Sequence, residues 1–292
     1  MEKIAIHIKT WLKEYCVKSG LKGFVVGVSG GVDSAVTSTL CAMTGLEVIA
    51  LNMPIYQAQD QLSLSRSHIS WLEHRYQNVK GITVDLTPSF QKIEHTLPND
   101  IQDDLTMANT RSRLRMITLY AFATHHKLLV AGTGNKVEDF GVGFYTKYGD
   151  GGVDISPIAD MFKTEVFELG RYLGINEDIL KAPPTDGLWS DGRTDESQIG
   201  ATYPELEWAM NYELRRSYIA NQFQDGNGDG EVKADVDDNF RIESDDEDET
   251  LLSSREREVL AIYRKFNQMN RHKMDPIPVC RVPHDLRLQR VK

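Results

Sequence analysis

The 292-residue sequence predicts an α/β fold, a doubly wound parallel sheet flanked by helices, with a helical C-terminal part. Short apolar segments rich in Val, Ile and Leu alternate with longer segments of helical spacing up to about residue 131. A glycine-rich turn follows the first apolar segment, at the sheet edge where open parallel sheets bind their ligands. After residue 140 the strand pattern fades, and the remaining periodic segments are helical.

The predicted elements follow in order from the apolar spacing. Residues 2–19 have apolar side chains at helical intervals and end at Ser19-Gly20, so we expect a helix there. A continuous apolar run over 24–28 predicts a buried strand, and 34–42 predict the helix after the glycine turn. Strands are then expected at 47–53, 81–86 and 128–131, with helices at 58–76 and 101–125.

The second half of the chain is predicted to be helical. Helices are expected over 163–173 and 204–222. Ser253 with Glu256 forms a capping-box pattern, which predicts a last helix through about residue 270. In the first half, the long helix expected at 101–125 should face the sheet with Leu114, Ile117, Leu119 and Phe122.

The formal charge of −10 comes from one segment. Residues 225–250 hold twelve Asp or Glu and two Lys or Arg, so the rest of the chain is neutral overall. The total charge therefore does not argue against an anionic ligand. We interpret residues 1–292 as a single domain in which 225–250 form an acidic, flexible insertion.

Part of this insertion, Asp225 to Gly230, resembles the start of an EF-hand calcium loop, with oxygen ligands at positions 1, 3 and 5 and glycine at position 6. Position 12 is Val236, where that loop needs a bidentate Glu. A solvated acidic segment is the favoured interpretation, and binding of Ca²⁺ is left open.

Composition excludes several classes of protein. No apolar segment approaches the ~20 residues needed to cross a bilayer, and the N-terminus lacks an apolar signal core. Cys16, Cys41 and Cys280 have no disulfide or metal-binding spacing, and no long basic stripe is present. We therefore expect a cytoplasmic protein that binds neither membranes nor nucleic acid.

The most informative motif is Ser29-Gly30-Gly31-Val32-Asp33-Ser34, between the first strand and its helix. Such a turn exposes backbone N–H groups beside the positive end of a helix dipole, which favours phosphate, and small residues let a polyphosphate approach the backbone. It is neither a Walker A loop nor a dinucleotide fingerprint. An ordinary glycine turn is the alternative, but chance produces these five fixed residues in well under ~1 in 1000 chains.

Several charged residues are candidates for the chemistry. Asp33 in this loop would repel phosphate unless Mg²⁺ lies between them; the alternative, compatible role is an N-cap. Glu138, shortly after the fourth predicted strand, would supply a second carboxylate, although a single Glu is more often plain surface. Arg111 and Arg115 share a helix face expected to be solvated, whereas Arg113 points elsewhere and suits a carboxylate or phosphate.

Four motifs in this order resemble the ammonia-dependent NAD synthetases, a family of PP-loop ATP pyrophosphatases. They are the phosphate loop, Asn-x-x-Ser-Arg-x-Arg-Met at 109–116, Gly-Thr-Gly-Asn-Lys-x-Glu at 132–138 and Thr-Lys-Tyr-Gly-Asp-Gly-Gly at 146–152. The resemblance covers about residues 5–220 and 255–285, and relative to the family pattern one extra residue lies between Glu138 and Lys147.

The resemblance implies a Rossmann-like sheet of the adenine nucleotide α-hydrolase type and a ligase that forms a C–N bond. This ligase would catalyse the last step of NAD biosynthesis, in which deamido-NAD, ATP and ammonia give NAD, AMP and pyrophosphate through an acyl-adenylate. A homodimer with the dinucleotide site at the subunit interface is implied as well. We expect the nitrogen donor to be free ammonia, or ammonia supplied by a separate protein, because no glutaminase region is recognisable in the sequence.

The resemblance also implies roles for individual residues. Asp33, Lys163 and Lys147 would carry the catalysis, and Asp33 with Glu138 would hold Mg²⁺. The residues at ATP-binding positions are Gly27, Val28, Ser29, Gly30, Gly31, Val32, Asp33, Ser34, Thr133, Lys163 and Thr185. The residues at deamido-NAD-binding positions are Arg113, Lys147, Asp154, His272 and Lys273.

The implied reaction needs no Cys or Ser nucleophile, so we expect catalysis by positioning and electrostatics. Two alternatives stay open: another PP-loop adenylating enzyme, acting in amidation or tRNA thiolation, and a non-catalytic ATP-binding module. The first would need a basic face or catalytic cysteines. The second is disfavoured by the joint presence of Asp33, Glu138 and Lys163.

Overall fold

A parallel sheet in the order β3-β2-β1-β4 occupies the N-terminal half of the computed structural model, which describes residues 1–57, 59–185, 194–224 and 249–283. Within these ranges β1 (Gly23–Gly27) is central, because it pairs with β2 on one side and β4 on the other. The other strands are β2 (Glu47–Asn52), β3 (Val79–Thr83) and β4 (Leu129–Val130). The predicted doubly wound α/β class is confirmed.

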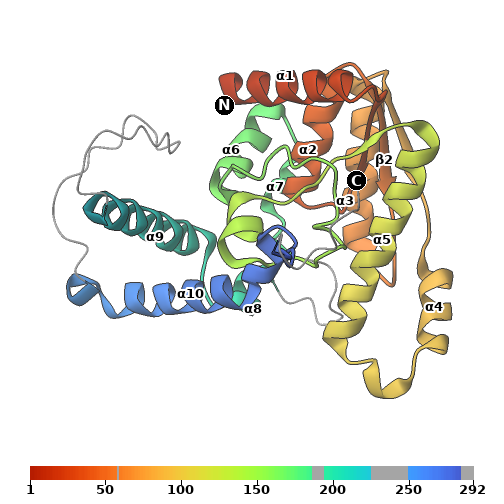
Figure 1. The fold of residues 1–292 in the computed structure, drawn as a ribbon. Helices are drawn as coiled ribbons and strands as arrows, with labels where there is room; N and C mark the ends of the chain where they lie inside the picture. The colour runs from red at the N-terminus through yellow and green to blue at the C-terminus, as the bar shows by residue number, and fades with distance from the viewer. Residues whose placement is uncertain (58, 186–193, 225–248, 284–292) are drawn as a thin grey trace, which may run out of the picture.

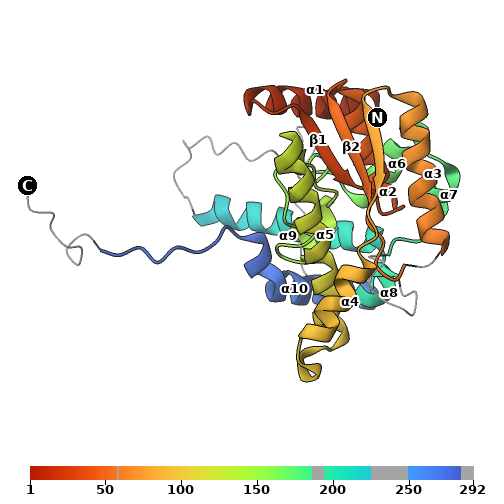
Figure 2. The same cartoon turned by 90° about the vertical axis from the view of Figure 1, so that its right-hand side faces the viewer.

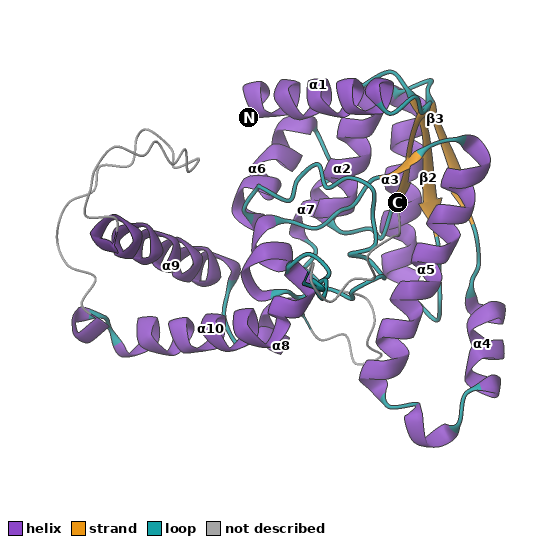
Figure 3. Ribbon diagram, in the orientation of Figure 1, coloured by secondary structure: helices purple, strands orange, loops and turns teal. Residues whose placement is uncertain are grey.

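Helices cover both faces of the sheet, as Figures 1 and 3 show. Because strand side chains alternate, Phe24 and Val26 pack on one face of β1 and Val25 on the other. The face of Phe24 is covered by α1 (Glu2–Lys18), α2 (Val32–Met43) and α6 (Lys163–Leu173), and the face of Val25 by α4 (Thr87–Thr96) and α5 (Asp104–His126). Helix α3 (Gln59–Arg75) lies beside β2 and β3.

Two expectations about this half are corrected. The third strand lies at Val79–Thr83 and not at 81–86, because its ladder partner β2 ends before Pro54, which has no N–H for pairing. Ile117 does not face the sheet: it is 59% exposed, while Leu114, Leu119 and Phe122 do pack against the core. Helix α4, which begins at Thr87 with a proline in its first turn, was not expected from the sequence.

The C-terminal part is helical, as predicted, and Figures 1 and 2 show α9 (Tyr203–Gln224) lying beside α10 (Ser254–Met274). The predicted capping box is present, since Ser253 caps α10 and pairs with Glu256. Both helices pack on the short π-helix η2 (Val137–Val142) through a shared apolar cluster. The remaining short elements are η1 (Asn99–Ile101), α7 (Glu177–Lys181), α8 (Asp195–Ile199) and η3 (Glu249–Leu251).

The edge of the sheet at the carboxyl ends of the strands is the one that positions the candidate site. After β4, Ala131 bridges to Ile155 in parallel, and the Gly132 N–H donates to the Ile155 carbonyl (2.7 Å). This pairing brings the loop at 143–152 to the same edge as the β1–α2 turn.

None of the helices in the described ranges is long and apolar enough to span a bilayer. The predicted acidic insertion, with its EF-hand-like start, lies almost wholly outside the described residues, and the single-domain assignment stays a prediction.

Candidate active site

The loop between β1 and α2 is shaped by two serine hydroxyls. The Ser29 N–H donates to Ser34 Oγ (3.2 Å), Ser34 Oγ donates to the Gly31 carbonyl (2.9 Å), and the Gly31 N–H donates to Ser29 Oγ (3.2 Å). Gly30 has a φ of 98°, which side chains rarely permit. The loop's own bonds therefore hold a curved backbone at the N-terminus of α2, where free N–H groups and the helix dipole favour an anion.

A cavity of about 280 Å³ opens along this loop. All of the predicted ATP-binding residues line it, including Thr133, Lys163 and Thr185, and so does Glu138. These residues come from separate parts of the chain, and the parallel topology brings them together because the carboxyl ends of β1 and β4 lie at one edge.

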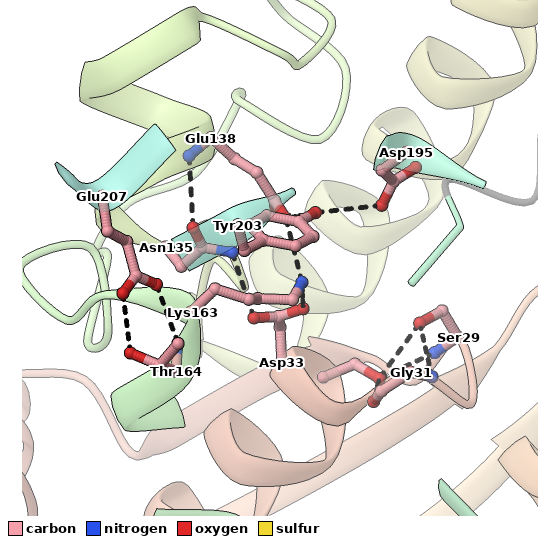
Figure 4. Close-up of polar contacts among 11 residues, drawn as sticks. Ser29, Gly31, Asp33, Asn135, Glu138, Lys163, Thr164, Asp195, Tyr203 and Glu207 are labelled. Atoms are coloured by element: carbon pink, nitrogen blue, oxygen red, sulfur yellow. Dashed lines mark hydrogen bonds and ion pairs between the residues drawn. The ribbon is translucent and has the colours of Figure 1, made fainter. Parts of the chain in front are cut away.

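Lys163 joins the two predicted metal ligands. Its Nζ lies 2.6 Å from Asp33 Oδ2 and 2.9 Å from Glu138 Oε1, and its side chain is 3% exposed (Figure 4). Lys163 is the first residue of α6, and Asp33 lies in the first turn of α2, so the packing of these two helices sets the contact. A buried ammonium shared by two carboxylates is costly to assemble unless each charge is paired, and here each one is.

The charges of this cluster depend on one another. Burial alone would lower the pKa of Lys163, but the Asp33 and Glu138 carboxylates outweigh burial and raise it. Burial likewise pushes the pKa of Glu138 upward, and Lys163 together with the Tyr203 hydroxyl holds it below its ordinary value. The lysine is therefore charged and Glu138 ionised across the neutral range.

Two residues that the sequence analysis gave no role complete the cluster. Asn135 is fully buried: its Nδ2 donates to Asp33 Oδ1 (3.2 Å), and its Oδ1 accepts from the Glu138 N–H (3.1 Å). The Tyr203 hydroxyl lies 2.6 Å from Glu138 Oε1 and 3.2 Å from Asp195 Oδ2. Asn135 lay inside a recognised motif and could have been singled out, whereas nothing in the sequence marked Tyr203 or Asp195.

Two interpretations made from the sequence are wrong. Asp33 is not the N-cap of α2; Gly31 holds that position, and the Asp33 carboxylate faces Lys163 and Asn135. The face of Arg111 and Arg115 is not solvated either. The Arg111 guanidinium lies 5.1 Å from the centre of the Phe90 ring, and Arg115 lines the cavity and donates from Nε to the Met53 carbonyl (3.1 Å).

The predicted deamido-NAD residues gather beside the cavity and not in its walls. Arg113 is exposed and donates to the Lys147 carbonyl from Nε and Nη2 (3.4 Å each). Lys147 Nζ donates to the His272 carbonyl (2.5 Å), and Lys273 Nζ donates to the carbonyls of Gly143 and Tyr145 (2.9 Å each). The end of α10 therefore holds the loop that follows η2. Burial lowers the pKa of Lys273.

Asp154 has different partners. Its Oδ1 accepts from the Tyr120 hydroxyl (3.0 Å) and its Oδ2 from the Val130 N–H (2.8 Å), so it ties the loop to β4. The stretch between Glu138 and Lys147, which is one residue longer than the family pattern, includes most of the π-helix η2.

The carboxylates of the cavity fit a divalent cation that is shared with a ligand. Among the described residues, no three His, Cys, Asp or Glu side chains are grouped to hold a metal by themselves. Mg²⁺ at nucleotide sites commonly uses only one or two carboxylates together with phosphate oxygens, and Asp33 and Glu138 match that requirement. Asp139 lies in the same wall but is mostly neutral at neutral pH, because burial, then Glu138 and other carboxylates, raise its pKa to about 8.

Comparison with known proteins agrees with this geometry. Residues 4–241 match the family described as NAD synthase. The chain is 40% identical over 201 residues to an NH(3)-dependent NAD(+) synthetase of Carboxydothermus hydrogenoformans, which spans 68% of this chain and 80% of the relative. It is 36% identical over 227 residues to the NH(3)-dependent NAD(+) synthetase of Sulfolobus acidocaldarius, spanning 76% and 75%.

Solved structures extend the similarity to nearly the whole chain. The NMN synthetase of Francisella tularensis superposes with a TM-score of 0.73 at 28% identity, covering 97% of this chain and 98% of that one. An NH3-dependent NAD synthetase from Campylobacter jejuni, in complex with the nitrate ion, gives a TM-score of 0.68 at 21% identity, covering 96% and 99%, and supports the fold.

Proposed function

The chain belongs to the NAD synthase family, and from that membership we propose its reaction: deamido-NAD, ATP and ammonia are converted to NAD, AMP and pyrophosphate. The chain is a ligase that forms an amide C–N bond in NAD biosynthesis. The observation that carries the proposal is the buried Lys163 between Asp33 and Glu138, beside a pre-shaped phosphate loop, in a chain of this family.

The order of bond changes follows from the reactivity of the acid. A carboxylate is a poor electrophile for ammonia, since oxide would have to leave. One carboxylate oxygen of the nicotinic acid group therefore attacks the α-phosphorus of ATP, the α–β phosphate bond breaks, and pyrophosphate leaves. Ammonia then attacks the carbonyl carbon of the acyl-adenylate, AMP departs with the C–O electron pair, and the surplus proton passes to solvent.

This first step brings a carboxylate towards a polyphosphate, so the site must offset negative charge. The backbone N–H groups at the α2 N-terminus and the charged Nζ of Lys163 are held in place before the step, which is the arrangement that stabilises developing charge most effectively. No covalent intermediate on a side chain is needed. In this proposal the chain contributes positioning and electrostatics.

Mg²⁺ held by Asp33 and Glu138 together with the phosphates is part of the proposal. When bound, it would neutralise the triphosphate and polarise the α-phosphate. The support is chemical: both carboxylates already contact one cation, the Lys163 ammonium, and both are hard oxygen ligands.

The proposal is tested by incubating the purified chain with ATP, Mg²⁺ and ammonium, with and without deamido-NAD, and quantifying AMP, pyrophosphate and NAD. Formation of all three only when deamido-NAD is present is the expected result. AMP formation with tRNA or another acid acceptor alone would instead identify another PP-loop adenylating enzyme. Tight ATP binding without AMP formation for any acceptor would identify a non-catalytic module.

A second acceptor is favoured by one observation. The Francisella tularensis NMN synthetase matches this chain over nearly the full length of both, at 28% identity. Nicotinic acid mononucleotide, the acid that corresponds to NMN, would present the same carboxylate without the adenylate half. Measuring kcat/KM for both acids in parallel decides the assignment, and a higher value for the mononucleotide would replace deamido-NAD as the substrate.

We also propose a homodimer and a cytoplasmic location. Arg113 is exposed rather than enclosed by the cavity, and Ile117, one helical turn away on α5, is an exposed apolar side chain on the same face. A second subunit covering that face would bury both. Light scattering at catalytic concentration tests the dimer: the expected mass is twice that of the 33.1 kDa chain.

The support for a cytoplasmic location is that Cys16 and Cys41 are free thiols in the core, in keeping with a reducing compartment.

A further inference from the structure

The first two turns of α9 direct two side chains, those of Tyr203 and Glu207, at the residues around Lys163. Tyr203 and Glu207 are four residues apart, so they lie on the same face of the helix. Figure 4 shows Tyr203 beside Glu138 and Lys163, and Glu207 pointing at Thr164, the residue after Lys163 on α6. Neither residue belongs to the motifs recognised in the sequence.

Tyr203 fixes the orientation of Glu138. Its hydroxyl donates to Glu138 Oε1 at 2.6 Å, and the same oxygen accepts from Lys163 Nζ at 2.9 Å. A carboxylate has lone pairs for about four contacts, so two donors on one oxygen hold the group in place without using up its capacity to bind a metal ion. Asp195 is farther from the hydroxyl, at 3.2 Å, so the single phenol proton is given to Glu138.

Tyr203 is suited to this role because it is enclosed. It is 4% exposed, and its ring lies under the Lys163 ammonium, 4.8 Å from Nζ to the ring centre. Burial and the neighbouring Glu138 and Asp195 carboxylates raise the pKa of Tyr203, so the hydroxyl keeps its proton and remains a donor at neutral pH.

Glu207 holds the start of α6. Its Oε1 accepts from the Thr164 N–H (2.9 Å) and its Oε2 from Thr164 Oγ1 (2.7 Å). A carboxylate at this place satisfies an N–H that the helix leaves unpaired and favours the positive end of its dipole. Because Lys163 immediately precedes Thr164, this bond sets the backbone position from which the lysine reaches Asp33 and Glu138.

We propose that Tyr203 and Glu207 are positioning residues for the metal–nucleotide site: the start of α9 sets the orientation of Glu138 and the placement of Lys163, and thereby the geometry in which Mg²⁺ and ATP bind. This inference rests on the proposed ATP chemistry of the same cavity. The inference goes beyond that chemistry because it assigns the positioning of Glu138 and Lys163 to α9, a helix whose described residues do not pack on the sheet.

The test is Tyr203→Phe in the full chain, with Tyr263→Phe as matched control. Tyr263 is also buried, in the same apolar cluster, but no carboxylate of the metal site contacts it. Calorimetry measures binding of an ATP analogue with a methylene group between the α and β phosphates, with Mg²⁺ and with EDTA. Loss of one hydrogen bond to a charged group predicts about tenfold weaker binding with Mg²⁺ in Tyr203→Phe, unchanged binding with EDTA, and wild-type values for Tyr263→Phe.

A double-mutant cycle separates positioning from general packing. In a Glu138→Gln background the Tyr203→Phe change should weaken Mg²⁺-dependent binding by less than twofold, because the contact it removes is already altered. If Tyr203→Phe does not fold, Glu207→Gln replaces it, with an expected fall in kcat of at least about tenfold at saturating ATP.

The outcomes distinguish the inference from the proposed function. Mg²⁺-dependent affinity in Tyr203→Phe within twofold of wild type would overturn the positioning role of Tyr203. An equal loss in the wild-type and Glu138→Gln backgrounds would overturn it too, since the effect would not pass through Glu138. Absence of Mg²⁺-dependent binding in the wild-type chain would instead refute the proposed ATP chemistry.

Discussion

Replacement of Lys163 by Met is expected to expose the energetics of the site most directly. The substitution keeps most of the side-chain volume but removes the charge, and it leaves Asp33 and Glu138 facing each other without a counter-ion. The two N–O distances of 2.6 and 2.9 Å correspond to about 6 kcal/mol of gross attraction each at an effective dielectric constant of about 20. Desolvation of the lysine offsets much of this, and breaking a buried pair costs about 3–5 kcal/mol net.

The free energy of unfolding, measured by urea denaturation at neutral pH without nucleotide, should fall by that amount. Lys136→Met is the matched control, because Lys136 pairs with Asp160 at 2.8 Å but the Asp160 side chain is 97% exposed. An exposed pair contributes under about 1 kcal/mol. Equal losses in the two variants would refute the conclusion that Lys163 is a buried, fully engaged charge.

Mg²⁺ should also distinguish Lys163→Met from the wild type. Without the lysine ammonium, Asp33 and Glu138 form a pair of hard ligands with no cation, so millimolar Mg²⁺ should restore part of the lost stability of Lys163→Met and leave the wild type unchanged. Turnover should fall about 100-fold or more even with Mg²⁺, because charge stabilisation at the phosphates is lost. Stability of Lys163→Met that does not respond to Mg²⁺ would contradict the assignment of the two carboxylates.

Three further predictions concern a buried histidine, a carboxylate of the cavity wall and a glycine beside α10. Burial lowers the pKa of His68 to about 4, below the ~6.5 of the unfolded chain, so the folded state binds fewer protons. The free energy of unfolding therefore falls as the pH falls from 6.5 to 4. His68→Gln should remove about 3 kcal/mol of that pH dependence, measured by urea titration. For Asp139 the sign is opposite: its pKa of about 8 means that the folded state binds more protons between pH 4 and 8, so stability falls as pH rises, and Asp139→Asn should flatten that slope. Gly143→Ala should cost about 1–3 kcal/mol more than Gly174→Ala, since both have a positive φ but only the first would place a Cβ 2.4 Å from the Cβ of Asn270 on α10.

Each of these has a clear contrary result. Parallel stability curves for wild type and His68→Gln below pH 6.5 would show that the buried histidine does not titrate differently on unfolding. Parallel curves for Asp139→Asn between pH 4 and 8 would contradict its placement among buried carboxylates. Equal losses for the two glycine variants would mean that α10 does not pack closely against the residue after η2.

Much of the sheet and the ATP-facing half of the site could be predicted from local patterns. A buried strand in a parallel sheet is a short apolar run, and the Ser29–Ser34 turn carries its own shaping bonds, so both are specified by neighbouring residues. Even so, the third strand was misplaced by two residues at its start and three at its end, because its extent depends on where the paired strand β2 stops, at Asn52 before Pro54, and pairing is not a local property.

The helix around Arg113 shows a different limit. Spacing correctly places Arg111 and Arg115 on one face, but it does not say whether that face meets solvent, and here it meets Phe90 and the cavity wall. The extra residue before Lys147 was visible in the sequence as an irregularity. Only the structure shows that this stretch contains a π-helix, on which α9 and α10 pack.

By itself the sequence determined the fold class, the phosphate loop, and which charged residues, Asp33, Glu138 and Lys163 among them, converge on it. These are recorded in contiguous motifs and in the order of strands and helices. The tertiary structure alone decided that Lys163 lies between the two carboxylates and that Tyr203 and Glu207 hold that arrangement. Those contacts join α9 to α6 and η2 across long stretches of chain, and their strength comes from burial, which no local pattern of residues contains.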